Sequence, residues 1–303
     1  MKLATYVRGN SERVGAVVEE RLYDLVDCLR ASGKGSPAVA SSVAAFLAGG
    51  PDACDSAQEA IACSEDFLVL DKVKLRAPIP CPGKLLCLAG NYADHILEGG
   101  GTFPGKEKMT PRCFLKPSTV VVGPGDAIRV PSSAAWVDWE LELAVVIGKT
   151  GRDIAVDKAA EYIGGYTVFN DLSARQLAFR QHRKMLPGDE FFDWLVGKWL
   201  DTFGPMGPWI TTADQVPQPD RLGMKLWLNG ELQQDGNTGQ MIFSPAEAIA
   251  FISQFVTLEP GDVISTGTPA GVGLAKKIKL KPGDRIRGEI EGLGVLENIV
   301  ETL

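Results

Sequence analysis

Histidine and long hydrophobic runs are scarce in this sequence, and each scarcity excludes a class of protein. The 303 residues include only His95 and His182, so a mechanism that needs an imidazole must use one of these two. No apolar run approaches the roughly 18 residues that a membrane-spanning helix requires. The first residues, MKLATYVRGNSER, contain no sustained apolar segment of the kind found in signal peptides. We therefore expect a cytoplasmic protein with no membrane partner.

Positively charged residues are fewer than negatively charged ones. The chain has 31 Lys and Arg residues against 38 Asp and Glu residues, a net charge of −7. A surface that binds nucleic acid needs a basic footprint, so we expect no nucleic-acid partner. An anionic substrate of this protein would have to meet a local positive centre.

Motifs for several common kinds of site are missing. The six cysteines include no CxxC pair and are irregularly spaced, which predicts reduced and mostly buried thiols rather than a disulfide framework. No G-x-S-x-G nucleophile elbow is present. The glycine-rich segment 266–273, TGTPAGVG, is neither a P-loop nor a dinucleotide fingerprint. This segment predicts a tight loop whose backbone closely approaches another group.

Proline spacing suggests how the chain is divided. The alternate prolines of residues 76–82 favour an extended backbone, which predicts a linker at this point. Residues 1–75, with strand-like runs and a helical pattern around SSVAAFLAGG, predict a small α/β domain. Residues 83–303 repeat the turn signal PGD and are predicted to be mostly β. The predicted fold class is therefore α+β, predominantly β.

Three local signals predict individual elements of the larger domain. The segment KLWLNGELQQ contains an Asn-Gly pair, which predicts a hairpin with a two-residue turn. Ser244 and Glu247 form a capping box with a proline at the first helical position, and this pattern predicts the start of a helix. Ser173 and Gln176 form a similar box, which predicts a helix over ARQLAFRQHR.

The segment 137–149, VDWELELAVVIGK, places three carboxylates where a strand is predicted. Alternate residues of a strand share a face, so one face carries only large apolar side chains. The other face carries Asp138, Glu140 and Glu142 at one end and apolar residues at the other. Like charges 4 Å apart cost about 4 kcal/mol at an effective dielectric constant of 20, and a bound divalent cation would remove that cost. The alternative interpretation is a solvated polar face on an edge strand.

Asp171 lies where a strand is predicted to end and a helix to begin, a position at which sites are often built. Together with Glu140 and Glu142 it offers three oxygen ligands, the donor type that Mg²⁺ and Mn²⁺ prefer. The lack of Cys and His in this set argues against zinc. The alternative role of Asp171, or of Asn170, is to cap the predicted helix.

His95 and Glu98 are three residues apart in AGNYADHILEGGG and share a face if this segment is a helix. Glu98 could then orient His95 and increase its basicity, as a carboxylate does for a general base. The glycines of residues 99–101 should end the helix and free the following loop, so that the helix can serve as a lid. The alternative is an exposed surface helix with an incidental His and Glu.

The larger domain resembles the fumarylacetoacetate hydrolase superfamily. The matching segments keep the family order and cover most of residues 83–303: GNYADHILE, FLKPSTVVVGPG, VDWELELAVVIGK, GGYTVFNDLSARQ, GKWLDTFGPMGPWI, NGELQQDGNTGQMIF and LEPGDVISTGTPAGVG. The first 75 residues resemble the variable small domain of longer members. The resemblance implies a layered β-sandwich roll with flanking helices, usually assembled as a homodimer.

The resemblance also implies roles for individual residues, in three groups. The ligands of Mg²⁺ or Mn²⁺ would be Glu140, Glu142 and Asp171. The catalytic groups would be the water-activating pair His95 and Glu98, and Lys198, which would stabilise an oxyanion. The substrate, a small anionic 2-oxo acid, would contact Arg175, Lys116 and Thr268.

The activity that the resemblance implies is hydrolysis of a carbon–carbon bond in a 2,4-dioxo acid of the acylpyruvate type. The metal would chelate the carboxylate and the 2-oxo oxygen, His95 would take a proton from water, and cleavage would leave an enolate held by the metal. The same site could decarboxylate oxaloacetate, or isomerise or hydrate an unsaturated 2-oxo diacid. A binding protein with a decayed site is a further alternative, which the complete set of family residues disfavours.

Overall fold

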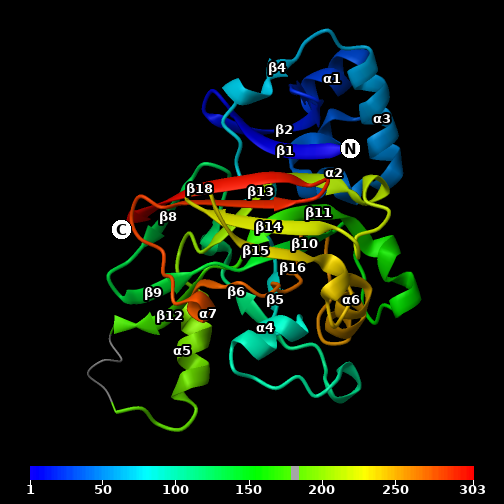
Figure 1. Ribbon diagram of the computed structural model, residues 1–303. Helices are drawn as coiled ribbons and strands as arrows, with labels where there is room; N and C mark the ends of the chain where they lie inside the picture. Colours follow the sequence, from blue (N-terminus) through cyan, green and yellow to red (C-terminus); the bar gives the residue numbers. More distant parts are fainter. Residues whose placement is uncertain (179–183) are drawn as a thin grey trace.

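A computed structural model describes residues 1–178 and 184–303 and has the predominantly β, α+β fold that the sequence predicts (Figure 1). The described strands are β1 (Lys2–Arg8), β2 (Ser11–Val18), β3 (Arg21–Asp24), β4 (Leu68–Val69), β5 (Leu85–Leu88), β6 (Cys113–Lys116), β7 (Val121–Val122), β8 (Ala127–Val130), β9 (Ala134–Asp138), β10 (Leu141–Ile147), β11 (Ile163–Asn170), β12 (Ser173–Leu177), β13 (Gly204–Thr212), β14 (Gly223–Leu228), β15 (Glu231–Asn237), β16 (Val263–Ser265), β17 (Arg285–Ile290) and β18 (Gly294–Thr302). The described α-helices are α1 (Leu25–Ser32), α2 (Val43–Ala48), α3 (Gly50–Ala62), α4 (Ala93–Glu98), α5 (Asp189–Gly197), α6 (Pro245–Ser253) and α7 (Gly273–Lys276).

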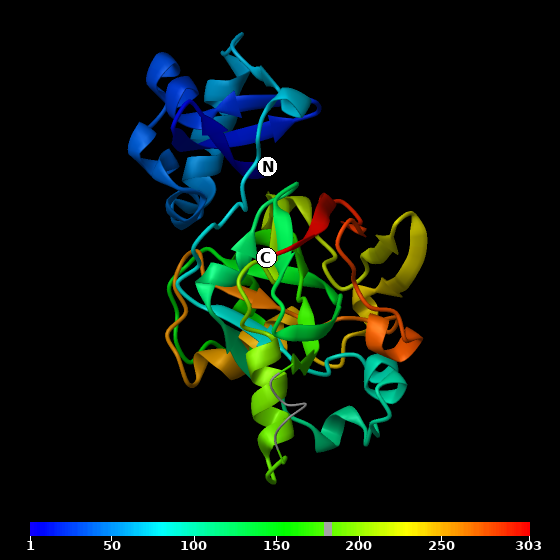
Figure 2. The same ribbon diagram turned by 90° about the vertical axis from the view of Figure 1, so that its left-hand side faces the viewer.

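The strands form two large sheets and a small one. Over the described residues, the largest sheet has eleven strands in the order β4-β3-β2-β1-β13-β11-β10-β16-β5-β6, with β7 beside β13. A five-stranded sheet has the order β15-β14-β17-β18-β8, and β9 pairs with β12. One face of β10 packs against the five-stranded sheet, and this contact forms the main hydrophobic core. The layered arrangement leaves α4 and α5 at the end of the molecule away from the N-terminal segment (Figures 1 and 2).

The N-terminal segment continues the largest sheet. Strand β1 pairs with β13, so that Leu3 lies opposite Ile210. Helices α1, α2 and α3 share a second hydrophobic core with side chains of β10, β11 and β13, among them Val146 and Met206. Residues 76–82 contain no helix or strand, bend at residues 78–81, and connect the two parts of the chain that Figure 2 shows. The division into domains at this connection stays a prediction.

Several local predictions are confirmed. The hairpin of β14 and β15 turns at Asn229 and Gly230, both with positive φ. Helix α6 begins at the expected capping box, in which Ser244 accepts from the Glu247 N–H while the Glu247 side chain accepts from the Ser244 N–H. Glycines of the PGD turns have positive φ, as the turn signal requires, and they are Gly125, Gly188, Gly261 and Gly283.

The helix predicted after Asp171 is wrong where the structure describes it. Residues 173–177 form strand β12, which pairs with β9, so that Ser173 lies opposite Asp138. Pairing with a neighbouring strand overrides the local capping pattern here. The remainder of the predicted helix, including His182, extends into 179–183 and lies outside the described residues.

The segment 137–149 also differs from the single strand that its alternation predicts. Strand β9 ends at Asp138 and β10 begins at Leu141, because the two strands pair with different partners. The prediction of its two faces is nevertheless confirmed. The apolar side chains that alternate from Val137 to Ile147 all belong to the main core, and Ala144 and Val146 belong to the second.

The cysteines are free, as expected, but the prediction that most are buried is wrong. Cys28 and Cys87 are buried, whereas Cys63, Cys81 and Cys113 are exposed. In the described part of the chain, every helix is too short or too polar to cross a bilayer.

Candidate metal centre and active site

The pairing of β10 with β11 brings Glu140 and Asp171 together. Leu141 lies opposite Asn170 at the end of this antiparallel ladder, so the next residue on each strand is a carboxylate. The Asp171 N–H donates to the Glu140 carbonyl at 2.8 Å, and the Glu140 N–H donates to Oδ1 of Asn170 at 3.0 Å. Asn170 therefore fixes the backbone of the site, and neither residue has the helix-capping role that was the alternative.

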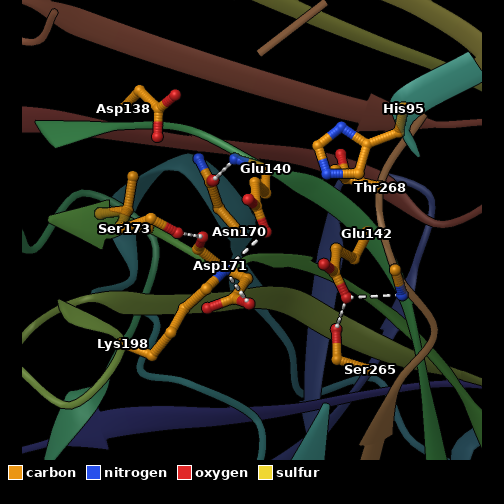
Figure 3. A network of polar contacts seen from close by, with 12 residues as sticks. His95, Asp138, Glu140, Glu142, Asn170, Asp171, Ser173, Lys198, Ser265 and Thr268 are labelled. Carbon is orange, nitrogen blue, oxygen red and sulfur yellow. Dashed lines mark hydrogen bonds and ion pairs between the residues drawn. The ribbon is translucent and has the colours of Figure 1, made fainter. Parts of the chain in front are cut away.

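Glu142 completes a cluster of three buried carboxylates. One carboxylate oxygen from each of Glu140, Glu142 and Asp171 lies within 4.8 Å of the others. Strand β10 is not an edge strand, because β11 and β16 flank it, and Glu142 is only 1% exposed. The alternative interpretation of these carboxylates, as a solvated polar face on an edge strand, is therefore wrong. Figure 3 shows the three carboxylates converging, with Glu142 on the side of His95 and Thr268.

Cationic side chains contact two of the three carboxylates. Lys198 Nζ donates to Oε2 of Glu140 at 2.6 Å and to Oδ2 of Asp171 at 2.7 Å. Arg175 Nε donates to Oδ1 of Asp138 at 2.7 Å, and its Nη2 donates to Oε1 of Glu140. Arg175 thus links the end of β9 to the start of β10.

Lys116 lies behind Asp171. Its Nζ donates to Oδ1 of Asp171, to the Phe203 carbonyl at 2.9 Å and to the Leu172 carbonyl at 3.2 Å. An ammonium group has three N–H donors, and all of them have acceptors here. The position of Lys116 therefore suits holding Asp171, and its predicted contact with substrate stays a prediction.

Glu142 has a different environment from its two neighbours. Its Oε2 accepts from the Ser265 hydroxyl at 2.6 Å and from the Gly267 N–H at 2.8 Å, both neutral donors. Burial, followed by repulsion from Asp171 and Glu140, raises the pKa of Glu142 well above its usual value. Burial also acts to raise the pKa of Glu140, but the charges of Lys198 and Arg175 outweigh it and lower that pKa.

The donor set and the charge balance fit a divalent cation. Among the described residues, four buried carboxylates of this network face three cations, which are Lys116, Arg175 and Lys198. The carboxylate left without a cationic partner is Glu142, and its nearest carboxylate neighbours repel it. A divalent cation would remove this repulsion, and carboxylate oxygens are the ligands that Mg²⁺ and Mn²⁺ prefer.

His95 and Glu98 form the pair that the sequence predicts, on helix α4. His95 Nδ1 lies 2.8 Å from Oε1 of Glu98, and α4 ends at Glu98, directly before the three glycines. A carboxylate accepts a hydrogen bond, so this contact places the ring proton on Nδ1 and leaves the lone pair on Nε2. The contact is the one that a general base requires, but the catalytic role of His95 and the lid role of α4 both stay predictions.

One loop supports three acidic residues from three different elements. Gly267, Gly271 and Leu274 donate their backbone N–H groups to Glu142, Glu98 and Asp138 at 2.8, 2.7 and 2.7 Å, respectively. We call residues 266–274, which include the first two residues of α7, the clamp loop. The close backbone approach that the glycine-rich sequence predicts is therefore confirmed. A Cβ on Gly271 would lie 2.4 Å from the Gln233 carbonyl, which shows how little space a side chain would have there.

Gln234 on β15 fixes the clamp loop to β10, and sequence reasoning did not identify it. Its Nε2 donates to Thr268 Oγ1 and to the Pro269 carbonyl, both at 2.8 Å, while its Oε1 accepts from the Leu141 N–H at 3.0 Å. Gln234 is fully buried. A lone amide on a strand carries no recognisable sequence signal, because its role depends on three backbone segments that only the fold brings together.

A small cavity of about 70 Å³ connects these groups. Six of the nine predicted site residues line it, namely His95, Glu140, Glu142, Arg175, Lys198 and Thr268. Glu98, Lys116 and Asp171 lie behind them, bonded to His95, Asp171 and Lys198, respectively. Phe114 and Trp194 also line the cavity, and the sequence did not single them out.

Comparisons with known proteins agree with this geometry. The sequence model described as fumarylacetoacetate (FAA) hydrolase C-terminal matches residues 84–301. The Xenopus laevis protein named oxaloacetate tautomerase fahd2, mitochondrial, is 42% identical over 87% of this chain and 80% of its own length.

Several solved structures resemble the chain over its whole length, among them two enzymes. Maleylpyruvate hydrolase from Sphingobium sp. SYK-6, in complex with manganese(II) and pyruvate, is 30% identical, covers 100% of this chain and 99% of its own, and has a TM-score of 0.78. The 2-hydroxyhepta-2,4-diene-1,7-dioate isomerase from Mycobacterium marinum is 30% identical over 100% of this chain and 98% of its own, with a TM-score of 0.75. The similar proteins are thus enzymes with different reactions.

Proposed function

Because the chain belongs to the fumarylacetoacetate hydrolase family, we propose that it is a metal-dependent enzyme that interconverts the enol and keto forms of a small 2-oxo dicarboxylate such as oxaloacetate. The observation that carries this proposal is the position of the His95–Glu98 pair on a small cavity lined by carboxylates and cations. A cavity of about 70 Å³ corresponds to a few water molecules, since one water needs roughly 10–15 Å³ on this measure. That size favours a short substrate.

The proposed metal ligands are Glu140, Glu142 and Asp171. When bound, Mg²⁺ or Mn²⁺ supplies a Lewis acid that draws electron density from a carbonyl oxygen of the substrate. The chain itself holds these ligands in place through Lys198, Arg175 and the clamp loop. The manganese and pyruvate of the Sphingobium hydrolase structure support the choice of cation and of substrate class, without deciding between Mg²⁺ and Mn²⁺.

His95 moves the proton in the proposed reaction. From the keto form, Nε2 takes one proton from C3, and the imidazolium returns that proton to the 2-oxygen, which gives the enol. The reverse direction uses the same two transfers. Glu98 stabilises the positive charge that His95 carries between them, as a carboxylate does for a general base.

Lys198 stabilises the negative charge that develops on the 2-oxygen. Although burial acts to lower the pKa of Lys198, Asp171 and Glu140 outweigh it and raise that pKa, so the side chain stays charged. Two of its N–H donors are bonded to these carboxylates, and the third is left for the substrate. A donor that is held in position before the reaction typically stabilises the transition state by several kcal/mol.

Hydrolysis of a carbon–carbon bond in a 2,4-dioxo acid is the second candidate. The free Nε2 of His95 and the likeness to maleylpyruvate hydrolase favour it. His95 would take a proton from water, the hydroxide would add to the distal carbonyl, and the bond to C3 would break. C3 would then receive the proton, so that the products are a carboxylic acid and a 2-oxo acid. Decarboxylation of oxaloacetate is a third reaction that the same groups would support.

Turnover measurements would distinguish the candidates. The loss of enol absorbance of oxaloacetate, carbon dioxide release and acylpyruvate cleavage should be measured with Mg²⁺, with Mn²⁺ and with a chelator, after subtraction of the uncatalysed rates. We expect metal-dependent tautomerisation to be fastest, and His95→Ala to slow it on the order of 10²–10⁴-fold, the usual worth of a general base. Faster acylpyruvate cleavage would favour the hydrolase. Tautomerisation that is unaffected by His95→Ala would refute the role given to His95.

Location and assembly are proposals as well. The Xenopus laevis relative is named as a mitochondrial protein, so it does not support the expected cytoplasmic location. The homodimer implied by the family resemblance and the lack of nucleic-acid or membrane partners also stay predictions.

A further inference from the structure

The wall of the cavity beside Lys198 is aromatic. Phe114 and Trp194 pack edge to face with ring centroids 4.8 Å apart. Lys198 Nζ lies 5.5 Å from the centroid of Phe114 and 5.9 Å from that of Trp194. The two rings thus flank the Lys198 ammonium on one side of the cavity. Any part of a substrate that extends past Lys198 must meet these two rings.

The two rings are supported differently. Phe114 lies on β6, is 9% exposed and belongs to a hydrophobic core that also contains Leu85 and Val263. Trp194 lies on α5 and is half-buried, and its ring stacks on Phe191, which is itself 59% exposed. Phe114 is thus part of this core, whereas Trp194 only packs against its surface, from a helix whose Phe191 side chain is exposed.

We propose that Trp194 is a specificity-determining residue, whose ring restricts this site to 2-oxo acids of about four carbons. This inference rests on the proposed function for the reacting groups. Trp194 acts through its size and not through charge. Its ring excludes substrate atoms that would extend beyond Lys198. Replacement by a smaller residue would extend the cavity along α5 and would admit longer chains without moving His95 or the carboxylates.

Binding provides the first test, because it needs no turnover. N-alkyl oxamates carry the 2-oxo acid head group with an alkyl chain of chosen length, and their dissociation constants can be measured by calorimetry with Mn²⁺ present. An extra methylene in an apolar site is worth roughly 3- to 4-fold in affinity. The wild type should bind oxamate better than N-butyl oxamate. Trp194→Ala should shift the ratio of the two affinities at least tenfold towards the butyl compound, and Trp194→Phe should shift it less.

Phe192→Ala is the matched control. Phe192 is an exposed aromatic residue of the same helix, and its ring packs edge to face against Phe191. This variant should keep the wild-type ratio. Thermal unfolding of all variants would show whether they fold, and Trp194→Leu provides a second cavity-enlarging variant if Trp194→Ala does not. An unchanged ratio in a folded Trp194→Ala or Trp194→Leu variant, or the same shift in Phe192→Ala, would overturn the proposal.

Exchange of the C3 hydrogens for deuterium, followed by NMR, provides the second test. The four-, five- and six-carbon 2-oxo diacids should be compared with Mn²⁺ in D₂O. We expect the wild type to prefer the four-carbon acid and Trp194→Ala to raise the relative rate of the six-carbon acid at least tenfold. If the wild type exchanges none of these acids above background, the proposed function fails. The oxamate ratios then still decide the role of Trp194.

Discussion

The backbone N–H of Gly271 donates to Oε2 of Glu98 at 2.7 Å, across 173 positions of sequence. The other oxygen of Glu98 contacts His95, so the clamp loop determines where the proposed base lies. The same loop bonds to Glu142, one of the proposed metal ligands. The proposed proton transfer and the proposed metal binding would therefore both depend on one short loop, and the following predictions test the groups that this loop connects.

Glu142→Gln should abolish Mn²⁺ binding while changing the free energy of unfolding by less than about 1 kcal/mol. The physical reason is that the Glu142 carboxylate is buried among like charges and bonded only to neutral donors. Calorimetry with Mn²⁺ and denaturant unfolding of the metal-free protein measure the two effects.

Glu140→Gln is the control for that experiment. It leaves Lys198 and Arg175 without a carboxylate that they share, and removal of one partner of a buried ion pair costs about 3–5 kcal/mol. Equal destabilisation by the two substitutions would show that the assignment of Glu142 as the unpaired carboxylate is mistaken.

Glu98→Gln should slow the reaction on the order of 10- to 100-fold, the usual effect of losing a group that orients a functional histidine. The amide oxygen can still accept from Gly271, but the side chain can no longer stabilise a charged His95. The turnover number and Michaelis constant should be measured beside Glu107→Gln, an exposed substitution in the loop that follows α4. If the Glu98→Gln and Glu107→Gln variants have equal rates, Glu98 does not assist His95 as proposed.

Gln234→Leu should destabilise the protein and reduce turnover together. The substitution leaves the Leu141 N–H and the Pro269 carbonyl without their partner, and each buried polar group left unsatisfied costs about 1–3 kcal/mol. The neighbouring Gln233→Ala removes the side-chain acceptor of a hydrogen bond from Lys276 without touching the clamp loop contacts of Gln234, and is the control. Full activity in a folded Gln234→Leu variant would mean that the clamp loop keeps its position without this amide.

Asp24 should make the N-terminal segment sensitive to acid. Burial acts to raise the pKa of this carboxyl, but hydrogen bonds from Arg13 and Tyr6 outweigh it and lower the pKa. Because the pKa of an unfolded aspartate is about 3.9, the unfolded state takes up the proton more readily than the folded state. The stabilisation by Asp24 is thus fully present above about pH 4 and is lost as the pH falls below that value.

Denaturant unfolding of the wild type and of Asp24→Asn would measure this effect. We expect the free energies of unfolding to differ by about 1.5–3 kcal/mol at pH 7, the range for hydrogen bonds to a charged group, and this difference should shrink as the pH falls below about 4. A difference that stays constant with pH would show that the charge of Asp24 is not what stabilises the segment.

Carboxylates at alternate positions of a strand, such as Glu140 and Glu142, are unfavourable in a buried strand unless something binds them. The sequence therefore suggests a metal site at this point, although the residues alone also allow a solvated face, and only the family resemblance selects the metal site. The His95–Glu98 spacing is equally local. By contrast, Gln234 and Trp194 act through contacts between elements that are distant in sequence, and an isolated glutamine or tryptophan carries no pattern that reveals such contacts.

The errors in the predicted fold have a similar cause. The capping pattern at Ser173 is a local signal, yet pairing with β9 determines the structure of residues 173–177. The break between Asp138 and Leu141 arises because β9 and β10 belong to different sheets. Patterns in one segment predict faces and turns, whereas the choice of partner strand depends on residues far away in the chain.

The pairing of β1 with β13 has a consequence for any shortened form of the protein. Without residues 1–75, the backbone of β13 near Ile210 would lose its partner, and Val146 and Met206 would lose part of their apolar cover. A strand edge with free N–H and C=O groups beside exposed apolar side chains can pair with the same edge of another molecule. The N-terminal segment would then protect the rest of the chain from aggregation, a role that requires no contact with substrate or metal.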